Sequence, residues 1–314
     1  MRALVTGAAG FVGSHLAEAL LARGDSVLGV DCFTPYYDRI DKEANVATAF
    51  AHDEFELIEA DLRTTDIAEL LDGVDTVFHQ AAQAGVRLSW SAGFADYVGH
   101  NVLATQRLLE AVQRSRPGAR VVYASSSSVY GNQARYPTTE TDLPRPFSPY
   151  GVTKLGAEHL CALYAENWGI HTVALRYFTV FGPRQRPDMS IHRLCEAAVR
   201  GLPFPRYGDG TQIREFTYID DVVAANLAAA DREMTPGSYV NIAGGAEITL
   251  NDLIALVEEV AGSPVAIEPG PQQAGDSFRN GGSIARARDV LGWEPQVSLR
   301  DGVVAQVEWH RSRV

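Results

Sequence analysis

Short runs of β-branched and apolar residues alternate with longer segments of helical period over roughly the first 178 residues. Because apolar runs bounded by turn residues suit strands that are buried on both faces, this alternation predicts a parallel sheet built from βαβ units. The expected strands are Ala3 to Thr6, Ser26 to Asp31, Phe55 to Ala60, Thr76 to His79, Arg120 to Ser125 and Thr172 to Tyr177. The clearest helices between them are Gly10 to Arg23, Ala104 to Arg114 and Pro149 to Trp168.

The pattern changes after Tyr177, where Gly and Pro residues separate shorter elements. Ser238 to Ala243 has the composition of one more strand, which we expect to return to the main sheet, and two helical segments end the chain, at Leu250 to Ala261 and Arg300 to Arg311. We therefore expect one unit of residues 1–178 plus about 212–245, and a smaller, loop-rich unit of residues 179–211 and 246–314.

Composition and charge narrow the classes of partner. A chain of 314 residues that is 46% hydrophobic and 21% charged is typical of a globular protein, and its net charge of -12 disfavours nucleic acid and acidic lipid. The sequence has no signal peptide and no apolar stretch long enough to span a bilayer, so we expect a cytoplasmic protein without a membrane partner. The three cysteines form no Cys-x-x-Cys pair and the histidines show no metal spacing, so no metal is expected.

A glycine-rich turn from Gly7 to Gly13 follows the first expected strand and opens a helix. In that context glycines let the backbone approach a pyrophosphate, although a purely structural glycine turn is the alternative. Asp31 ends the second strand, where a carboxylate would accept hydrogen bonds from the adenosine ribose and repel a 2′-phosphate. These features predict an NAD site, and its other expected contacts at this edge of the sheet are Phe11, Val12, Asp61, Leu62, Ala81, Ala82 and Gln83.

Tyr150 and Lys154 stand four residues apart at the head of an expected helix, so both project from one face. A tyrosine that acts as a base near neutral pH needs its pKa lowered by about 3 units, or about 4 kcal/mol of phenolate stabilisation. A nearby ammonium and the positive nicotinamide are the obvious sources. The strand that ends in the serine run from Ser125 to Ser128 would bring hydroxyl groups to the same edge.

Together these motifs, in this order, resemble the extended short-chain dehydrogenase/reductase family along essentially the whole chain. The resemblance implies an α/β fold with a Rossmann-like doubly wound parallel sheet and a smaller α/β C-terminal substrate lobe. It implies Tyr150 as the base, Lys154 as a ligand of the nicotinamide ribose, and Ser126 as the hydroxyl that assists proton transfer. It also adds Asn101 and Tyr177 to the cofactor contacts and implies a homodimer through two long helices.

Within the family, the chain is most similar to the UDP-glucuronate 4-epimerases at Tyr36 to Asp38, Ala84 to Arg87 and Arg176 to Met189. UDP-galactose epimerases usually carry Asn at the position of Thr179. A hydroxyl there, with Arg186 behind it, suits a sugar carboxylate at C5. The resemblance implies a UDP-sugar partner whose expected contacts are Arg87, Ser127, Ser128, Thr179, Arg186, Arg214 and Arg279.

The resemblance implies that an NAD-dependent enzyme interconverts UDP-glucuronate and UDP-galacturonate through a transient 4-keto sugar. Alternatives within the family are a UDP-glucose 4-epimerase and a nucleotide-sugar dehydratase or decarboxylase. Dehydratases typically carry Asp-Glu, and the decarboxylases Glu, where this chain has Ser127 and Ser128. An NAD-sensing scaffold on the same fold is the non-enzymatic alternative, and the intact Ser126, Tyr150 and Lys154 disfavour it.

Overall fold

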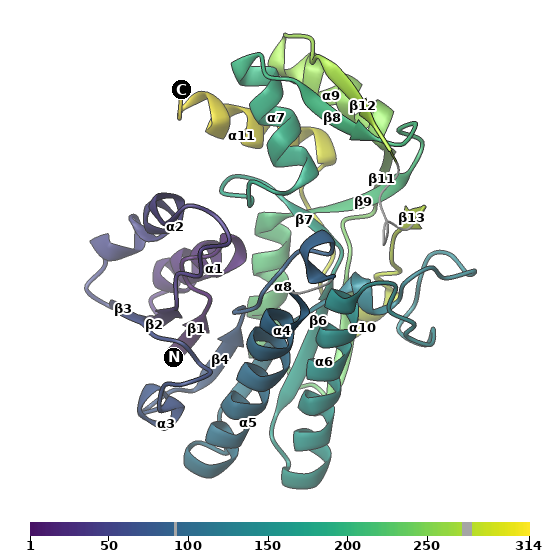
Figure 1. Ribbon diagram of the computed structural model, residues 1–314. Helices are drawn as coiled ribbons and strands as arrows, with labels where there is room; N and C mark the ends of the chain where they lie inside the picture. Colours follow the sequence, from purple (N-terminus) through teal and green to yellow (C-terminus); the bar gives the residue numbers. More distant parts are fainter. Residues whose placement is uncertain (91–92, 272–277) are drawn as a thin grey trace.

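A parallel sheet of seven strands organises the computed structural model, which describes residues 1–90, 93–271 and 278–314 (Figure 1). The strand order is β10-β6-β5-β4-β1-β2-β3, and each neighbouring pair is parallel. The strands are β1 (Arg2–Thr6), β2 (Ser26–Asp31), β3 (Phe55–Glu59), β4 (Thr76–His79), β5 (Arg120–Ser126), β6 (Thr172–Tyr177) and β10 (Ser238–Ile242). The order reverses direction between β1 and β4, which is where open α/β sheets bind ligands, so the expected Rossmann-like fold is confirmed.

Helices cover both faces of this sheet (Figure 1). One face carries α1 (Phe11–Ala22), α8 (Ile219–Asp231) and α10 (Ala285–Leu291), and the other carries α3 (Ile67–Leu70), α5 (Ala104–Ser115) and α6 (Pro149–Trp168). Along β1, Ala3 and Val5 join the core on the α1 side, whereas Leu4 joins the core on the α5 side. The strand is apolar from Ala3 to Val5, as expected where side chains on both of its faces are buried.

The helix α6 begins and ends at residues with strong local preferences. Ser148 caps its N-terminus by accepting a hydrogen bond from the Gly151 amide at 3.1 Å, and Pro149 occupies the first turn. Gly169 ends the helix in the left-handed conformation, with φ +68°. These signals fix Tyr150 and Lys154 in the first turns of a rigid element.

The helix that precedes β5 starts earlier than its sequence indicated. α4 (Phe94–Tyr97) continues through a π-helical segment, η4 (Val98–Leu103), into α5. In a π-helical segment the side chains are spaced around the axis differently from an α-helix. The apolar residues of Val98–Leu103 therefore do not follow the helical period that predicts a helix from sequence. The expected start at Ala104 is therefore the start of the regular part alone.

A second lobe lies beyond the carboxyl ends of the central strands (Figure 1). A four-stranded sheet comprises β7 (Thr179–Phe181), β9 (Ile213–Tyr218), β11 (Ala246–Thr249) and β13 (Arg279–Asn280), and β8 (Phe204–Tyr207) pairs with β12 (Ile267–Gly270). The other helices of this lobe are α7 (Ser190–Arg200), α9 (Leu250–Ala261) and α11 (Leu299–Arg311). Of the segment expected over 212–245, β9 lies in the second sheet, while α8 and β10 join the central one.

Short helical segments complete the fold. α2 (Arg39–Val46) and η1 (Ala49–Ala51) connect β2 to β3, η2 (Arg87–Ser89) follows β4, and η5 (Ser127–Val129) follows β5. None of the helices in the described ranges is both long and apolar enough to cross a bilayer.

Candidate active site

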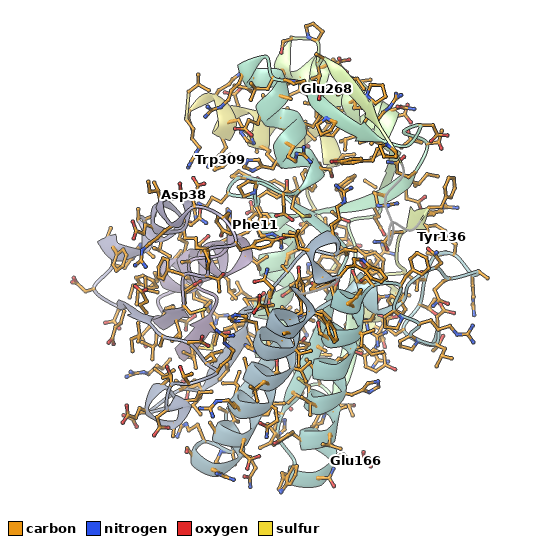
Figure 2. The ribbon with its side chains drawn as sticks, in the orientation of Figure 1. Phe11, Asp38, Tyr136, Glu166, Glu268 and Trp309 are labelled. Carbon is orange, nitrogen blue, oxygen red and sulfur yellow. The ribbon has the colours of Figure 1, made fainter. Side chains whose placement is uncertain are left out.

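Two adjoining cavities occupy the switch point of the central sheet. The first, of about 210 Å³, lies along the glycine turn, and the second, of about 670 Å³, extends from the serine run into the second lobe. Phe11, Tyr150, Tyr177 and Arg186 line both cavities. Figure 2 shows Phe11 at the middle of the molecule, between the sheet and the second lobe.

The glycine turn is packed so closely that Gly7 and Gly13 have no room for a side chain. A Cβ atom at Gly13 would lie 2.1 Å from the Gly7 carbonyl oxygen, and one at Gly7, whose φ is +69°, would lie 2.8 Å from the Ala81 amide nitrogen. Gly10 is the N-cap residue of α1 and provides no side-chain cap, so the first amides of the helix remain available to an anion. This arrangement fits the pyrophosphate of a dinucleotide.

The first cavity collects nearly all of the residues that the sequence assigns to the cofactor. They are Gly7, Gly10, Phe11, Val12, Gly13, Asp31, Asp61, Leu62, Ala81, Ala82, Gln83, Tyr150, Lys154 and Tyr177. Asp31 is 9% exposed, and its carboxylate accepts hydrogen bonds from the amides of Ala9 at 3.1 Å and Phe33 at 2.8 Å. The negative charge at the end of β2 suits the ribose of NAD better than a 2′-phosphate.

Lys42 lines the same cavity, although the sequence gave no reason to select it. Its ammonium donates to the Thr34 carbonyl oxygen at 2.8 Å and lies 4.9 Å from the centre of the Tyr37 ring. Burial lowers the pKa of this ammonium, and the neighbouring Asp31 carboxylate opposes that shift. Lysines are common on short amphipathic helices, so the sequence alone does not mark Lys42 as a site residue. The fold brings it to the cavity.

Asn101 does not line the first cavity but supports its wall. Its side-chain oxygen accepts a hydrogen bond from the Gln83 amide at 2.8 Å, and its amide nitrogen donates to the Gln83 carbonyl oxygen at 3.0 Å. The same nitrogen donates to the Thr153 hydroxyl at 2.9 Å. Asn101 therefore ties the loop after β4 to α6, between Tyr150 and Lys154.

Tyr150 lines both cavities, and Lys154, one helical turn later, lines the first. Burial raises the pKa of the Tyr150 phenol, whereas the Arg186 charge and a hydrogen bond with Ser126 act to lower it. Lys154 is 2% exposed, and burial lowers the pKa of its ammonium to about 7, against the smaller opposing effects of Cys161 and Glu158. A base near neutral pH needs a lower pKa than this, and positive charge close to the phenol favours its deprotonated form.

A buried ion pair lies beneath the serine run. Arg176 donates to both carboxylate oxygens of Glu158 and, at 2.6 Å, to the Tyr130 hydroxyl. Ser125 donates to Glu158 at 2.7 Å. This network connects β5, β6 and α6 directly behind Ser126 and fixes the end of the strand that presents it.

The second cavity brings together most of the residues expected to contact the sugar nucleotide. They are Arg87, Ser127, Ser128, Thr179, Arg186 and Arg214. The Ser127 hydroxyl accepts a hydrogen bond from Asn280 at 3.1 Å, and the Arg87 guanidinium lies 4.4 Å from the centre of the Tyr207 ring. Hydroxyl groups and guanidinium groups thus line a cavity that Tyr150 also lines, which suits an anionic sugar nucleotide.

Arg279 is the exception among the expected substrate residues, because it lines neither cavity. Its guanidinium pairs with Glu247, at 2.6 Å, and lies 3.4 Å from the centre of the Tyr136 ring. Figure 2 shows Tyr136 at the outer edge of the molecule. Arg279 thus lies outside both cavities, on β13 beside β9, where the next residue, Asn280, is paired with Arg214.

Two further features concern charge in the site. Asp188, which the sequence did not single out, pairs with Arg186 and lines the second cavity. Within the ranges that the structure describes, no three His, Cys, Asp or Glu side chains gather in a way that could hold a metal ion.

Comparison with known proteins places this site in a family. The model of the NAD dependent epimerase/dehydratase family matches residues 3–243. YtcB of Bacillus subtilis, an uncharacterized UDP-glucose epimerase, is 41% identical over 313 residues, which cover 98% of both chains. The UDP-glucuronate 4-epimerase of Thermodesulfobacterium geofontis is 34% identical over 317 residues, which cover 99% of this chain and 96% of that one.

A solved structure agrees with these relatives. The UDP-glucuronic acid 4-epimerase from Bacillus cereus, crystallised with UDP-glucuronic acid and NAD, superposes with a TM-score of 0.96 at 40% identity, and the match covers 100% of both chains. The chain therefore belongs to the NAD dependent epimerase/dehydratase family, as the resemblance in its sequence predicted, and NAD is its cofactor.

Proposed function

We propose that this protein interconverts UDP-glucuronate and UDP-galacturonate by NAD-dependent epimerisation at C4 of the sugar. The observation that carries the proposal is the second cavity, in which Tyr150 and Ser126 face the same space as Thr179 and Arg186. A hydroxyl and a guanidinium there suit the carboxylate of a hexuronate. The serines at 127 and 128 leave no carboxylate at the position where relatives that eliminate water or carbon dioxide carry one.

The side chains at the junction of the cavities supply the proton transfer. Tyr150 removes the proton from the C4 hydroxyl and later returns it, and Ser126 holds the hydroxyl oxygen in line with the phenol. In this proposal Lys154 binds the nicotinamide ribose and adds positive charge near Tyr150. When bound, NAD supplies a positively charged ring that accepts a hydride from C4 and gives it back to the other face.

The substrate carboxylate also needs control during this reaction. A sugar oxidised at C4 is a β-keto acid, which loses carbon dioxide readily when its carboxylate can align for C–C cleavage. Hydrogen bonds from Thr179, Ser127 and Ser128, together with the Arg186 charge, would hold the carboxylate out of that alignment. Arg87 and Arg214 lie along the same cavity and are the cations available to the diphosphate.

UDP-glucose 4-epimerisation is the second candidate. It is favoured by the identity of 41% with YtcB and by the pairing of Arg186 with Asp188, which leaves less positive charge for a carboxylate. The two candidates differ in the substituent at C5 of the sugar. Both candidates use the same cofactor, the same base and the same reaction at C4.

The two candidates are separated by incubating the purified protein with NAD and either UDP-glucuronate or UDP-glucose, and resolving the products by chromatography and mass spectrometry. We expect UDP-glucuronate to give an isomer of unchanged mass, with a higher kcat/KM than UDP-glucose. Turnover of UDP-glucose alone would reject the hexuronate assignment. A product that has lost carbon dioxide would show a decarboxylase.

The homodimer expected from the resemblance is part of the same proposal. η4 and α6 pack together and expose the apolar side chains of Val98, Leu103, Val152 and Leu163, which are 39–52% exposed. A second copy of the chain on this face would bury them. Light scattering after size exclusion should give twice the chain mass, and a monomer at micromolar concentration would contradict the proposal. The cytoplasmic location stays a prediction.

A further inference from the structure

Asp188 forms an ion pair with Arg186, the arginine that lines the second cavity together with Thr179. The Arg186 guanidinium donates from Nε to one Asp188 oxygen at 2.9 Å and from Nη2 to the other at 3.0 Å, a bidentate pair. The Tyr36 hydroxyl donates to the same carboxylate at 3.1 Å. The loop after β2 and the loop after β7 thus meet at Asp188.

This pair lies close to the reacting groups. Arg186 lines both cavities, Asp188 lines the second, and the charges of both residues act on the Tyr150 phenol in opposite directions. Their side chains are 21% and 39% exposed, so water screens the pair only in part. Before a substrate binds, the charge that Arg186 presents to the cavity is therefore largely balanced.

We propose that Asp188 is a specificity-determining residue, which by pairing with Arg186 reduces the preference of the site for a C5 carboxylate over a neutral C5 hydroxymethyl group. This inference rests on the proposed function. A hexuronate carboxylate that approaches Arg186 meets the attraction of the guanidinium and the repulsion of Asp188. A neutral hexose leaves the pair intact, so it binds without exposing an unpaired guanidinium to a desolvated site.

The test compares kcat/KM for UDP-glucuronate and UDP-glucose in the wild type and in Asp188→Asn, which keeps the shape of the side chain and removes its charge. We expect the ratio of the two values to rise about tenfold or more in favour of UDP-glucuronate, since a unit charge a few ångströms away is removed. Asp188→Ser is the second variant and should shift the ratio in the same direction. Circular dichroism checks that both variants fold.

The matched control is Glu294→Gln, which removes the carboxylate from an exposed pair with Arg288 at 3.0 Å, away from both cavities. It should leave the ratio as in the wild type. An unchanged ratio in both Asp188 variants would overturn the proposal. A fall would also overturn it, because Asp188 would then act by orienting Arg186 toward the carboxylate. If the wild type converts neither UDP-sugar, the proposed function fails instead.

Discussion

Replacing Arg176 with Met is expected to destabilise the protein more than any exposed arginine substitution. Arg176 is 1% exposed and Glu158 is 5% exposed, so neither charge has water as an alternative partner. The substitution removes the hydrogen bonds from Arg176 to Glu158 and to the Tyr130 hydroxyl. The Glu158 carboxylate is left buried, with the Ser125 hydroxyl as its remaining donor among the described side chains.

The expected magnitude follows from this imbalance. Breaking a buried ion pair by removing one partner lowers the free energy of unfolding by about 3–5 kcal/mol, because an uncompensated charge stays inside the protein. Removing both charges, in Glu158→Leu combined with Arg176→Met, should return the stability to within about 2 kcal/mol of the wild type. The double variant is therefore more stable than Arg176→Met alone.

Urea denaturation followed by circular dichroism measures these free energies, provided that the slope against urea stays constant. The control is Glu259→Gln, which breaks an exposed pair with Arg300 at 2.7 Å and should leave the midpoint unchanged. A loss below about 1 kcal/mol for Arg176→Met, or a double variant no more stable than it, would show that the unpaired Glu158 charge is not the cause of the destabilisation.

Three further predictions concern the base, the glycine turn and pH. Tyr150→Phe should abolish turnover while isothermal titration still detects NAD and UDP-sugar binding, and an active variant would sink the base assignment. Gly13→Ala forces a Cβ to within 2.1 Å of the Gly7 oxygen, so the free energy of unfolding should fall by about 1–3 kcal/mol. Calorimetric titration should also give a lower affinity for NAD. Wild-type stability and affinity in this variant would count against the tight turn. Burial lowers the pKa of His310 from 6.5 to about 3, so the folded protein keeps this imidazole neutral. Below pH 6.5 the unfolded chain takes up a proton that the folded protein does not, and the free energy of unfolding should fall by about 2 kcal/mol at pH 5. His310→Leu should flatten the pH dependence of unfolding between pH 7 and 5, and an equal slope would exclude this histidine.

The central sheet was predictable because strands such as β1 and β4 are buried on both faces and therefore appear in the sequence as apolar runs between turn residues. Ser148, Pro149 and Gly169 mark the ends of α6 without tertiary information. The second lobe was not, since β7 and β13 contain three and two residues and take their conformation from β9 beside them. Pairing across distant segments leaves little periodic signal in such short strands.

The site was predictable to the extent that its residues sit at the ends of regular elements. Tyr150, Lys154 and Ser126 lie there. Asp188 was missed although it stands two residues after Arg186, because a loop carboxylate has no pattern that separates a solvated group from an arginine partner. Arg279 stays a predicted substrate contact, and the sequence gave no sign of its pair with Glu247, which the fold brings to it from 32 residues away along the chain.

The most direct test of the account follows deuterium at C4 of the sugar. UDP-glucuronate labelled with deuterium at C4 is incubated with the enzyme and NAD in ordinary water, and the product is examined by NMR and mass spectrometry. We expect UDP-galacturonate that keeps the deuterium at C4, because the hydride leaves and returns within one site. Loss of the label to water, or a product inverted at another carbon, would contradict it.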